Sequence, residues 1–298
     1  MTPDSLWKDN ILYQPESLIE VYKNKLIALS MYEHAKNHTN NSVGATGGRN
    51  DDETKKHFAE RFLTSSARTQ FVVIDPREDF KTVSNNLKST FSSGEISILD
   101  IPAGTGAGIL SLLTSLAELR FHSKLPKLPL HVNIVGADFS TSALMIYSQL
   151  LQEIENVLKQ HLIFIEYETC EWDATNPQST NLLIRQFLKE EDKYEEHYVL
   201  MSAFSGVGSS NYKKFDKSFD YIQTALSHLH TTILYIEPNT NEASTFLGFI
   251  DKLHNKLTTW LSKVINLSIN PDARFQWHDP ITGNTPKSAI ILKQYSRE

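Results

Sequence analysis

The fold of this chain is decided by the stretch Ile96-Ser-Ile-Leu-Asp100-Ile-Pro-Ala-Gly104-Thr-Gly106-Ala-Gly108-Ile-Leu110. Its apolar start predicts a buried strand that ends at Asp100, and a helical pattern begins near Ala107. Glycines let a backbone come close to a ligand, and the start of a helix offers free N–H groups with a partial positive charge. The stretch therefore predicts a strand, a ligand-binding turn and a helix. A plain connection without a ligand is the alternative.

Two phosphate-binding motifs do not fit this turn. A dinucleotide fingerprint has the pattern Gly-x-Gly-x-x-Gly, whereas Gly108 comes one residue too early for the third position. A Walker loop ends in Gly-Lys-Ser or Gly-Lys-Thr, and the sequence contains neither. A dinucleotide or nucleotide-sugar enzyme is therefore only a third choice of function.

From Glu95 onward, short apolar runs alternate with helical patterns. The predicted strands cover 96–101, 131–137, 163–168, 198–203, 232–236, a weak one near Phe275, and 289–293. The predicted helices cover 108–121, 141–160, 180–190, 216–228 and 241–261. Such alternation is typical of a parallel sheet with helices on both faces, and the spacing of the units indicates an α/β, doubly wound fold.

The glycine turn resembles the first motif of class I S-adenosylmethionine-dependent methyltransferases, Asp/Glu-x-x-x-Gly-x-Gly. It stands here as Asp100-Ile-Pro102-Ala103-Gly104-Thr105-Gly106, and the likeness covers about residues 95–298. The resemblance implies a Rossmann-like seven-stranded sheet with an antiparallel last strand, and S-adenosyl-L-methionine as the cofactor. It also implies that the carboxylate meets the cofactor's ammonium group, directly or through water, while the turn backbone lines the amino-acid end and the ribose.

An acid also ends the second predicted strand. Asp138 is followed by Phe139 and Ser140, where a new helix begins. In the family an acid at this place accepts both ribose hydroxyls, which suits a pair of charged oxygens. The alternative is that Asp138 helps Ser140 to cap the helix.

Residues after the third and fourth strands complete the implied cofactor site. Trp172, Asp173 and Ala174 follow the third strand, where the family commonly places an acid and a small residue against the adenine. Trp172 is equally a candidate core residue. At the end of the fourth strand, Ser202, Ala203 and Phe204 border the place where donor and acceptor should meet, because ligands bind beyond the carboxyl ends of parallel strands.

The methyl acceptor is left open by the sequence. The fifth strand ends in Glu237-Pro238-Asn239, and an acid followed by proline is frequent there in the family, so Glu237 is the predicted catalytic residue. No Asn-Pro-Pro-Tyr or Asp-Pro-Pro-Tyr follows the fourth strand, and the lone cysteine, Cys170, follows the third. The acceptor could therefore be a small molecule, RNA or a protein.

The composition of the chain excludes several classes of partner and site. The chain has 29 Lys and Arg against 35 Asp and Glu, hence a net charge of −6. This balance argues against bulk nucleic-acid binding, which rests on clustered basic residues. One cysteine excludes an internal disulfide or a multi-cysteine metal site. Neither a secretory signal nor an apolar run of about 18 residues is visible, so a cytoplasmic protein without membrane contact is expected.

The first 92 residues read as a separate helical segment. Helical patterns cover 16–32 and 52–72, and a polar run between them predicts a mobile lid at 40–50. We therefore predict an N-terminal helical cap or lid over 1–92 and a methyltransferase domain over 93–298. The cap helices would also offer an interface for a homodimer or a protein partner. Within the cap, Tyr32 and His57 are further candidate bases.

Two histidines of the cap, His34 and His38, have the i, i+4 spacing that can share a metal. No Glu follows the first of them as in zinc proteases, so no metal is predicted.

The predicted function is S-adenosylmethionine-dependent transfer of a methyl group. The main alternative is a cofactor-binding but catalytically silent methyltransferase-like subunit that acts through partner binding.

Overall fold

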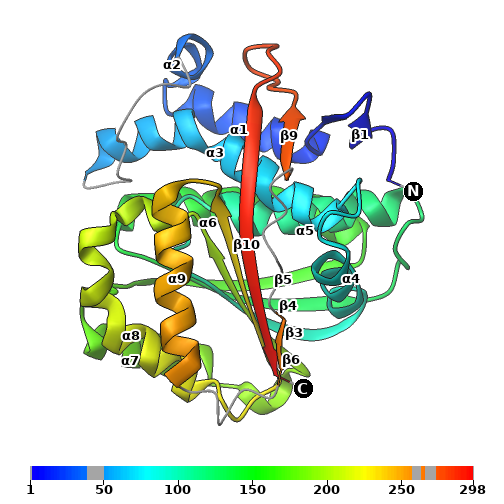
Figure 1. Cartoon of the computed structure of the whole chain (residues 1–298). Coiled ribbons are helices and arrows are strands. Elements are labelled where there is room, and N and C mark those ends of the chain that lie inside the picture. The colour runs from blue at the N-terminus through cyan, green and yellow to red at the C-terminus, as the bar shows by residue number, and fades with distance from the viewer. Residues whose placement is uncertain (1, 39–49, 257–262, 266–272, 298) are drawn as a thin grey trace.

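The structure is a computed structural model that describes residues 2–38, 50–256, 263–265 and 273–297 (Figure 1). Within these residues ten strands form one sheet. They are β1 (Trp7–Lys8), β2 (Ile11–Leu12), β3 (Gly94–Asp100), β4 (Leu130–Asp138), β5 (Ile163–Glu171), β6 (Glu196–Ser202), β7 (Thr231–Pro238), β8 (Lys263–Ile265), β9 (Arg274–Trp277) and β10 (Lys287–Arg297).

Nine described α-helices accompany the sheet, with three short 3-10 turns. The helices are α1 (Glu16–Ala28), α2 (Tyr32–Asn37), α3 (Asp51–Ile74), α4 (Lys81–Thr90), α5 (Ala107–Phe121), α6 (Thr141–Gln160), α7 (Pro177–Phe187), α8 (Tyr212–Ala225) and α9 (Asn241–Lys256). The turns are η1 (Glu191–Lys193), η2 (Phe204–Val207) and η3 (Ser209–Asn211). No described helix combines the length and apolar character needed to cross a membrane.

Five parallel strands form the centre of the sheet. Nine strands follow the order β1-β2-β9-β10-β7-β6-β3-β4-β5, and β8 pairs with β10. Among these five, β3 comes first in the chain; β4 and β5 follow on one side of it, and β6 and β7 then lie on its other side. This is the predicted doubly wound arrangement, with its switch point between β3 and β6. The antiparallel pairing of β10 with β7 also agrees with the prediction.

The predicted count of seven strands is wrong. The sequence patterns missed β1, β2 and β8, which have two or three residues each and are too short to show an alternating pattern. The N-terminal segment is consequently not purely helical, because β1 pairs with β2 and β2 joins β9.

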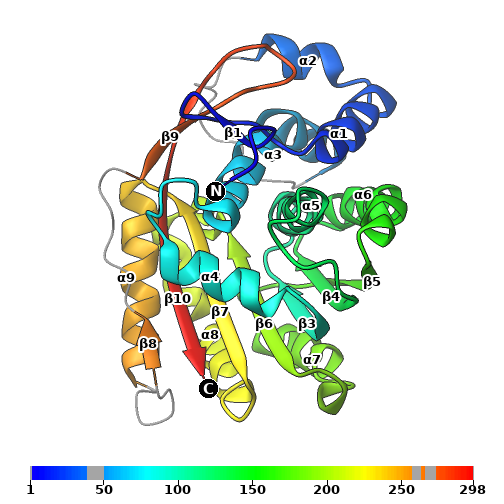
Figure 2. The ribbon, with the colours of Figure 1, turned by 90° about the vertical axis from the view of Figure 1, so that its right-hand side faces the viewer.

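Successive strand residues alternate between two apolar cores. Ile98 and Leu200 pack into the core shared with α5 and α6, whereas Leu99 and Val199 pack into the core formed with α7, α8 and α9. Figure 2 shows these two groups of helices on opposite sides of the sheet. Because neighbouring side chains of a strand point to opposite faces, the nearly continuous apolar runs of β3 and β6 are buried on both sides.

Helix α3 lies across the carboxyl ends of the central strands (Figure 1). Near its start, the hydroxyl oxygens of Thr54 and Ser140, the residue before α6, share a hydrogen bond of 3.3 Å. Farther along, the Ser66 hydroxyl donates to the carbonyl of Ala107 at the start of α5, 3.3 Å away. The apolar side of α3 belongs to the same core as β3 and α5, so the two predicted domains share a core. The predicted lid, Asn50 excepted, lies outside the described residues.

Gly136 of β4 is needed where α6 crosses the strand. A Cβ atom there would lie 2.7 Å from Cε1 and Cζ of the fully buried Tyr147. We expect Gly136→Ala to lower the free energy of unfolding by about 1–3 kcal/mol, as overpacking does, measured by urea denaturation. Gly248→Ala in α9 is the control, because a Cβ at Gly248 meets nothing within 4 Å. An equal loss in both variants would contradict this account.

Candidate functional site

The turn after β3 has the backbone that its glycines predict. Gly104 has φ +51° and Gly106 has φ +90°, both in the left-handed region that favours glycine. The Ala103 N–H donates to the carbonyl of Ala137, 2.8 Å away, and ties the turn to β4. A Cβ at Gly104 would meet nothing within 4 Å, so the space beside this backbone is open.

Asp138 joins this turn to the one after β4. Its Oδ2 accepts from the Gly104 N–H at 2.9 Å, and its Oδ1 accepts from the Ser140 N–H at 2.8 Å. Burial raises the pKa of this carboxyl, and the backbone donors oppose the rise. A carboxylate has about four acceptor positions, so both oxygens retain capacity for further donors. The cap of α6 is Ser140 itself, whose Oγ accepts from Ala143 N–H at 3.2 Å.

Phe139 is the exposed ring at this edge. It follows Asp138 directly, and 64% of its surface is exposed. Large aromatic side chains are usually buried, so an exposed ring beside an open glycine turn is a candidate surface for stacking a planar ligand.

Asp100 lies at the end of β3 and is almost fully buried. Its Oδ2 is without a hydrogen-bond partner among the described residues, as is the hydroxyl of Tyr147. Burial holds the pKa of Asp100 well above its usual value; Tyr147 acts to lower it, although no hydrogen bond of standard geometry joins the two groups. The negative charge of Asp138 raises it further. One buried oxygen is thus left for another donor.

The structure places the residues after β5 mainly in supporting roles. Trp172 is buried in the second core, and its indole N–H donates to Thr180 Oγ1 at 3.0 Å. Asp173 Oδ1 accepts from both the N–H and the hydroxyl of Thr175, at 2.8 and 2.7 Å. Ala174 packs partly buried against the same core. This geometry favours the core interpretation of the Trp172 ring.

Glu237 is fully buried beneath η2. Its Oε1 accepts from the Phe204 N–H at 2.8 Å, and its Oε2 accepts from the N–H and the hydroxyl of Ser205, at 3.1 and 2.7 Å. Burial raises the pKa of Glu237 to about 7, while these donors and Arg68 act to lower it. The carboxylate therefore holds the turn that begins at Ala203, where φ is +60°. This arrangement favours a positioning role over proton transfer.

Arg68 of α3 is a functional candidate that the sequence patterns did not indicate. Its positive charge acts on Glu237, and its Nη1 donates a long hydrogen bond of 3.4 Å to Ser65 Oγ. Its Nε is buried without a partner in the part of the chain that the structure describes. Seven residues separate it from Arg61, a spacing that places both on one side of a helix, so helical periodicity could have revealed it.

The two histidines of the cap that were considered as metal ligands both contact Glu60. His34 Nε2 is 2.9 Å from a carboxylate oxygen of Glu60, and His38 Nε2 is 3.1 Å from the carbonyl of Glu60. Across the described residues, no group of three or more His, Cys, Asp or Glu side chains could hold a metal ion. Tyr32 belongs to α2, which lies beyond α3 from the sheet (Figures 1 and 2), whereas His57 belongs to α3.

Comparisons with known proteins give little beyond this geometry. No family model matches the chain, and no curated protein matches its sequence. Among solved structures, the chain is similar to a candidate S-adenosyl-L-methionine-dependent methyltransferase from Methanococcus maripaludis, with 12% sequence identity. The alignment covers 79% of this chain and 93% of that chain, with a TM-score of 0.34. A likeness at this level supports no assignment of function.

Proposed function

We propose that the chain binds S-adenosyl-L-methionine at the carboxyl ends of β3 and β4 and transfers its methyl group to an acceptor. The observation that carries this proposal is the meeting of the open Gly104 turn, the bridging carboxylate of Asp138 and the exposed ring of Phe139 at one edge. That edge adjoins the switch point, where doubly wound sheets bind their ligands.

The residues present fit the chemical groups of this cofactor. The buried Oδ2 of Asp100 suits an ammonium donor, whose positive charge would oppose the burial that raises the pKa of this carboxyl group. The remaining acceptor positions of Asp138 suit two ribose hydroxyls, and Phe139 offers a face for the adenine. The cofactor carries no phosphate, in keeping with a glycine turn that lacks the dinucleotide spacing.

For methyl transfer, the protein mainly has to align the methyl donor with the acceptor. A bound sulfonium supplies a methyl group whose C–S bond breaks with its electron pair kept by sulfur, while the acceptor atom forms the new bond to carbon. The chain has to orient the two partners in line and exclude water, which accounts for several kcal/mol of such a barrier. A base is needed only where the acceptor atom is protonated. The anchored Glu237 then acts by holding η2 in place.

Isothermal titration with S-adenosyl-L-methionine and with S-adenosylhomocysteine tests the cofactor site. We expect one site per chain, and about tenfold weaker binding for Phe139→Ala, because stacking on an aromatic ring contributes about 1–1.5 kcal/mol. Phe121→Ala is the matched control, because Phe121 is 67% exposed but ends α5 at the opposite edge of the sheet. Absence of binding to the unmodified chain would refute the proposal.

Turnover separates the enzyme from the silent subunit. With the cofactor bound, transfer of a labelled methyl group is to be measured with small-molecule, RNA and protein acceptors. Transfer to any of these supports the enzyme. Binding without transfer to any acceptor would favour a catalytically silent subunit.

A further inference from the structure

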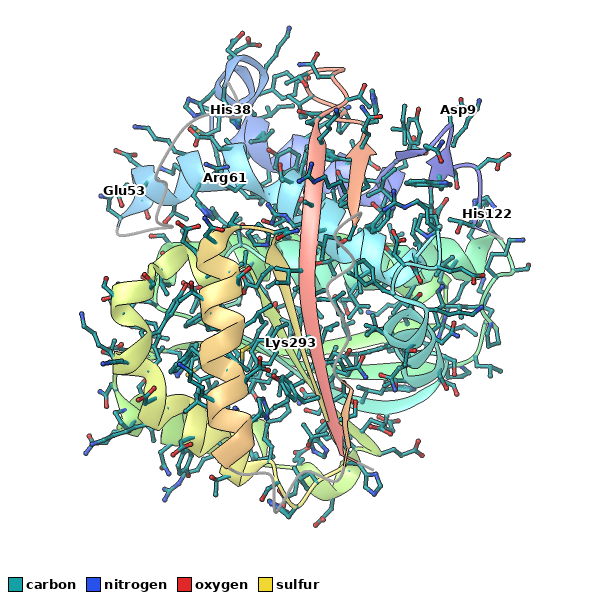
Figure 3. The ribbon with its side chains drawn as sticks, viewed as in Figure 1. Asp9, His38, Glu53, Arg61, His122 and Lys293 are labelled. Carbon is teal, nitrogen blue, oxygen red and sulfur yellow. The ribbon has the colours of Figure 1, made fainter. Side chains whose placement is uncertain are left out.

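A cavity of about 270 Å³ lies among α1, α2, α3 and the connection from β9 to β10. Helix α2 and this connection lie beyond α3 from the sheet, so α3 separates the cavity from the carboxyl ends of the strands (Figures 1 and 2). Figure 3 labels His38, which borders the cavity just after α2. The described lining shares no residue with the proposed cofactor site, so the cavity is a separate place for a ligand.

Two buried polar atoms of the lining have no hydrogen-bond partner among the described residues. They are the indole Nε1 of Trp277, which is almost fully buried, and Nδ1 of His38. His38 Nε2 lies 3.1 Å from the carbonyl oxygen of Glu60, which can only accept, so Nε2 carries the proton and Nδ1 of the neutral ring is an acceptor. Buried polar groups are normally paired, so a ligand or ordered water should complete one donor and one acceptor here.

The charge of the lining is negative. It contains two carboxylates, Asp279 and Glu60, and its described residues include neither Lys nor Arg. Glu60 faces His34 Nε2 at 2.9 Å, whereas the described contacts of Asp279 are those of its own turn, with Oδ2 accepting from the Thr282 hydroxyl at 2.8 Å. Burial raises the pKa of Tyr22, which also lines the cavity, and the negative charge of Asp279 raises it further. A protonated amine would balance this charge and donate to a carboxylate.

We propose that the cavity binds a small molecule with a protonated amine at one end and a hydrogen-bond acceptor at the other. The carboxylate of Asp279 and Nδ1 of His38 accept from the amine, while the indole of Trp277 donates to the acceptor group. Leu63 and Ile281 also line the cavity and suit a hydrocarbon body. At roughly 30 Å³ each, the share of one water molecule, the volume takes about nine non-hydrogen atoms. The inference does not depend on the proposed function.

Tyramine is the probe, because a short hydrocarbon body joins its amine to a hydroxyl. It is titrated into the isotope-labelled full chain, and the indole signals of the four tryptophans are followed in proton–nitrogen correlation spectra. The signal that Trp277→Phe removes is that of Trp277. We expect this signal to shift until it saturates. The signal of Trp172 should stay in place, because its N–H already donates to Thr180 Oγ1.

Isothermal titration gives the affinities of the variants and of two matched probes. Asp279→Asn should weaken tyramine binding about tenfold or more, because a neutral amide replaces the charged acceptor. Trp277→Phe should weaken it about fivefold, the loss of one neutral hydrogen bond. Asp192→Asn is the control, since Asp192 is exposed in η1. Phenethylamine, which lacks the hydroxyl, and para-ethylphenol, which lacks the amine, should both bind more weakly than tyramine.

Several outcomes would overturn the inference. If the Trp277 signal did not respond to tyramine, the cavity would hold only ordered water. Equal affinities in the unmodified chain, Asp279→Asn and Trp277→Phe would place tyramine elsewhere, and tighter binding of para-ethylphenol than of tyramine would exclude an amine site. Unchanged positions of the remaining indole signals show that Trp277→Phe is folded; if it is not, Asp279→Asn alone decides.

Discussion

Replacement of Asp138 by alanine is expected to weaken binding of S-adenosyl-L-methionine at least about 100-fold. The proposed site gives this carboxylate two ribose hydroxyls to accept, and a hydrogen bond to a charged group contributes about 1.5–3 kcal/mol. Two such bonds exceed the 2.8 kcal/mol or so that corresponds to 100-fold. The variant also loses the acceptor of the Gly104 N–H, which shapes the turn. Isothermal titration measures the change.

Three further variants make this prediction specific. The cofactor affinity of Asp138→Asn should lie between that of the unmodified chain and that of Asp138→Ala, because the amide oxygen can still accept a hydrogen bond while the amide nitrogen cannot. Asp173→Ala should have a small effect, because Asp173 forms a local turn with Thr175. Gly104→Arg tests the same space, since an arginine side chain would enter the open region and φ of +51° disfavours it. If Asp138→Ala bound S-adenosyl-L-methionine with unchanged affinity and kept its melting temperature, the cofactor would have to bind elsewhere.

The sequence predicted the centre of the fold because its signals are local. The strand from Ile96, the glycine turn and the helix after it are one continuous pattern, and each of the five parallel strands has its own apolar run. The predicted start of a helix was less accurate where the residue that caps its N-terminus was overlooked. Helix α7 begins at Pro177, after Asn176 accepts from the Gln178 N–H, three residues before the predicted start. Proline at the first helical position is a usable start signal.

The roles of polar residues at strand ends could not be predicted from local sequence patterns. Asp138 and Glu237 both lie at the ends of strands. The carboxylate of Asp138 is bonded to the Gly104 turn, beside which the space is open, whereas the oxygens of Glu237 accept from η2. The difference depends on which loop folds over each carboxylate, and that is set by contacts distant in sequence. Trp172 shows the same limit, because its burial depends on Thr180 and the second core.

Arg120 is a buried cation that holds together the amino edge of the sheet, the edge opposite the proposed site. It lies in the last turn of α5 and is 3% exposed. Its guanidinium donates to five backbone carbonyl oxygens, those of Phe91 (3.4 Å), Ser92 (2.8 Å), Leu128 (2.7 Å), His161 (2.8 Å) and Leu162 (3.1 Å). These carbonyls belong to the ends of α4 and α6 and to the segment before β4. One side chain thus joins three segments that are distant in sequence.

Arg120→Met should therefore lower the free energy of unfolding by about 3–5 kcal/mol, since removing a buried charged donor leaves several carbonyls unpaired. Urea denaturation measures this loss, and the melting temperature should fall by about 10 °C. Arg120→Lys should recover less than half of the loss, because an ammonium has three donors and no planar fork. Arg185→Met, on the exposed side of α7, should change stability by no more than about 0.5 kcal/mol. Cofactor affinity should persist in folded Arg120→Met, since Asp138 lies at the other end of β4. A loss below about 1 kcal/mol would mean that water replaces the guanidinium at these carbonyls.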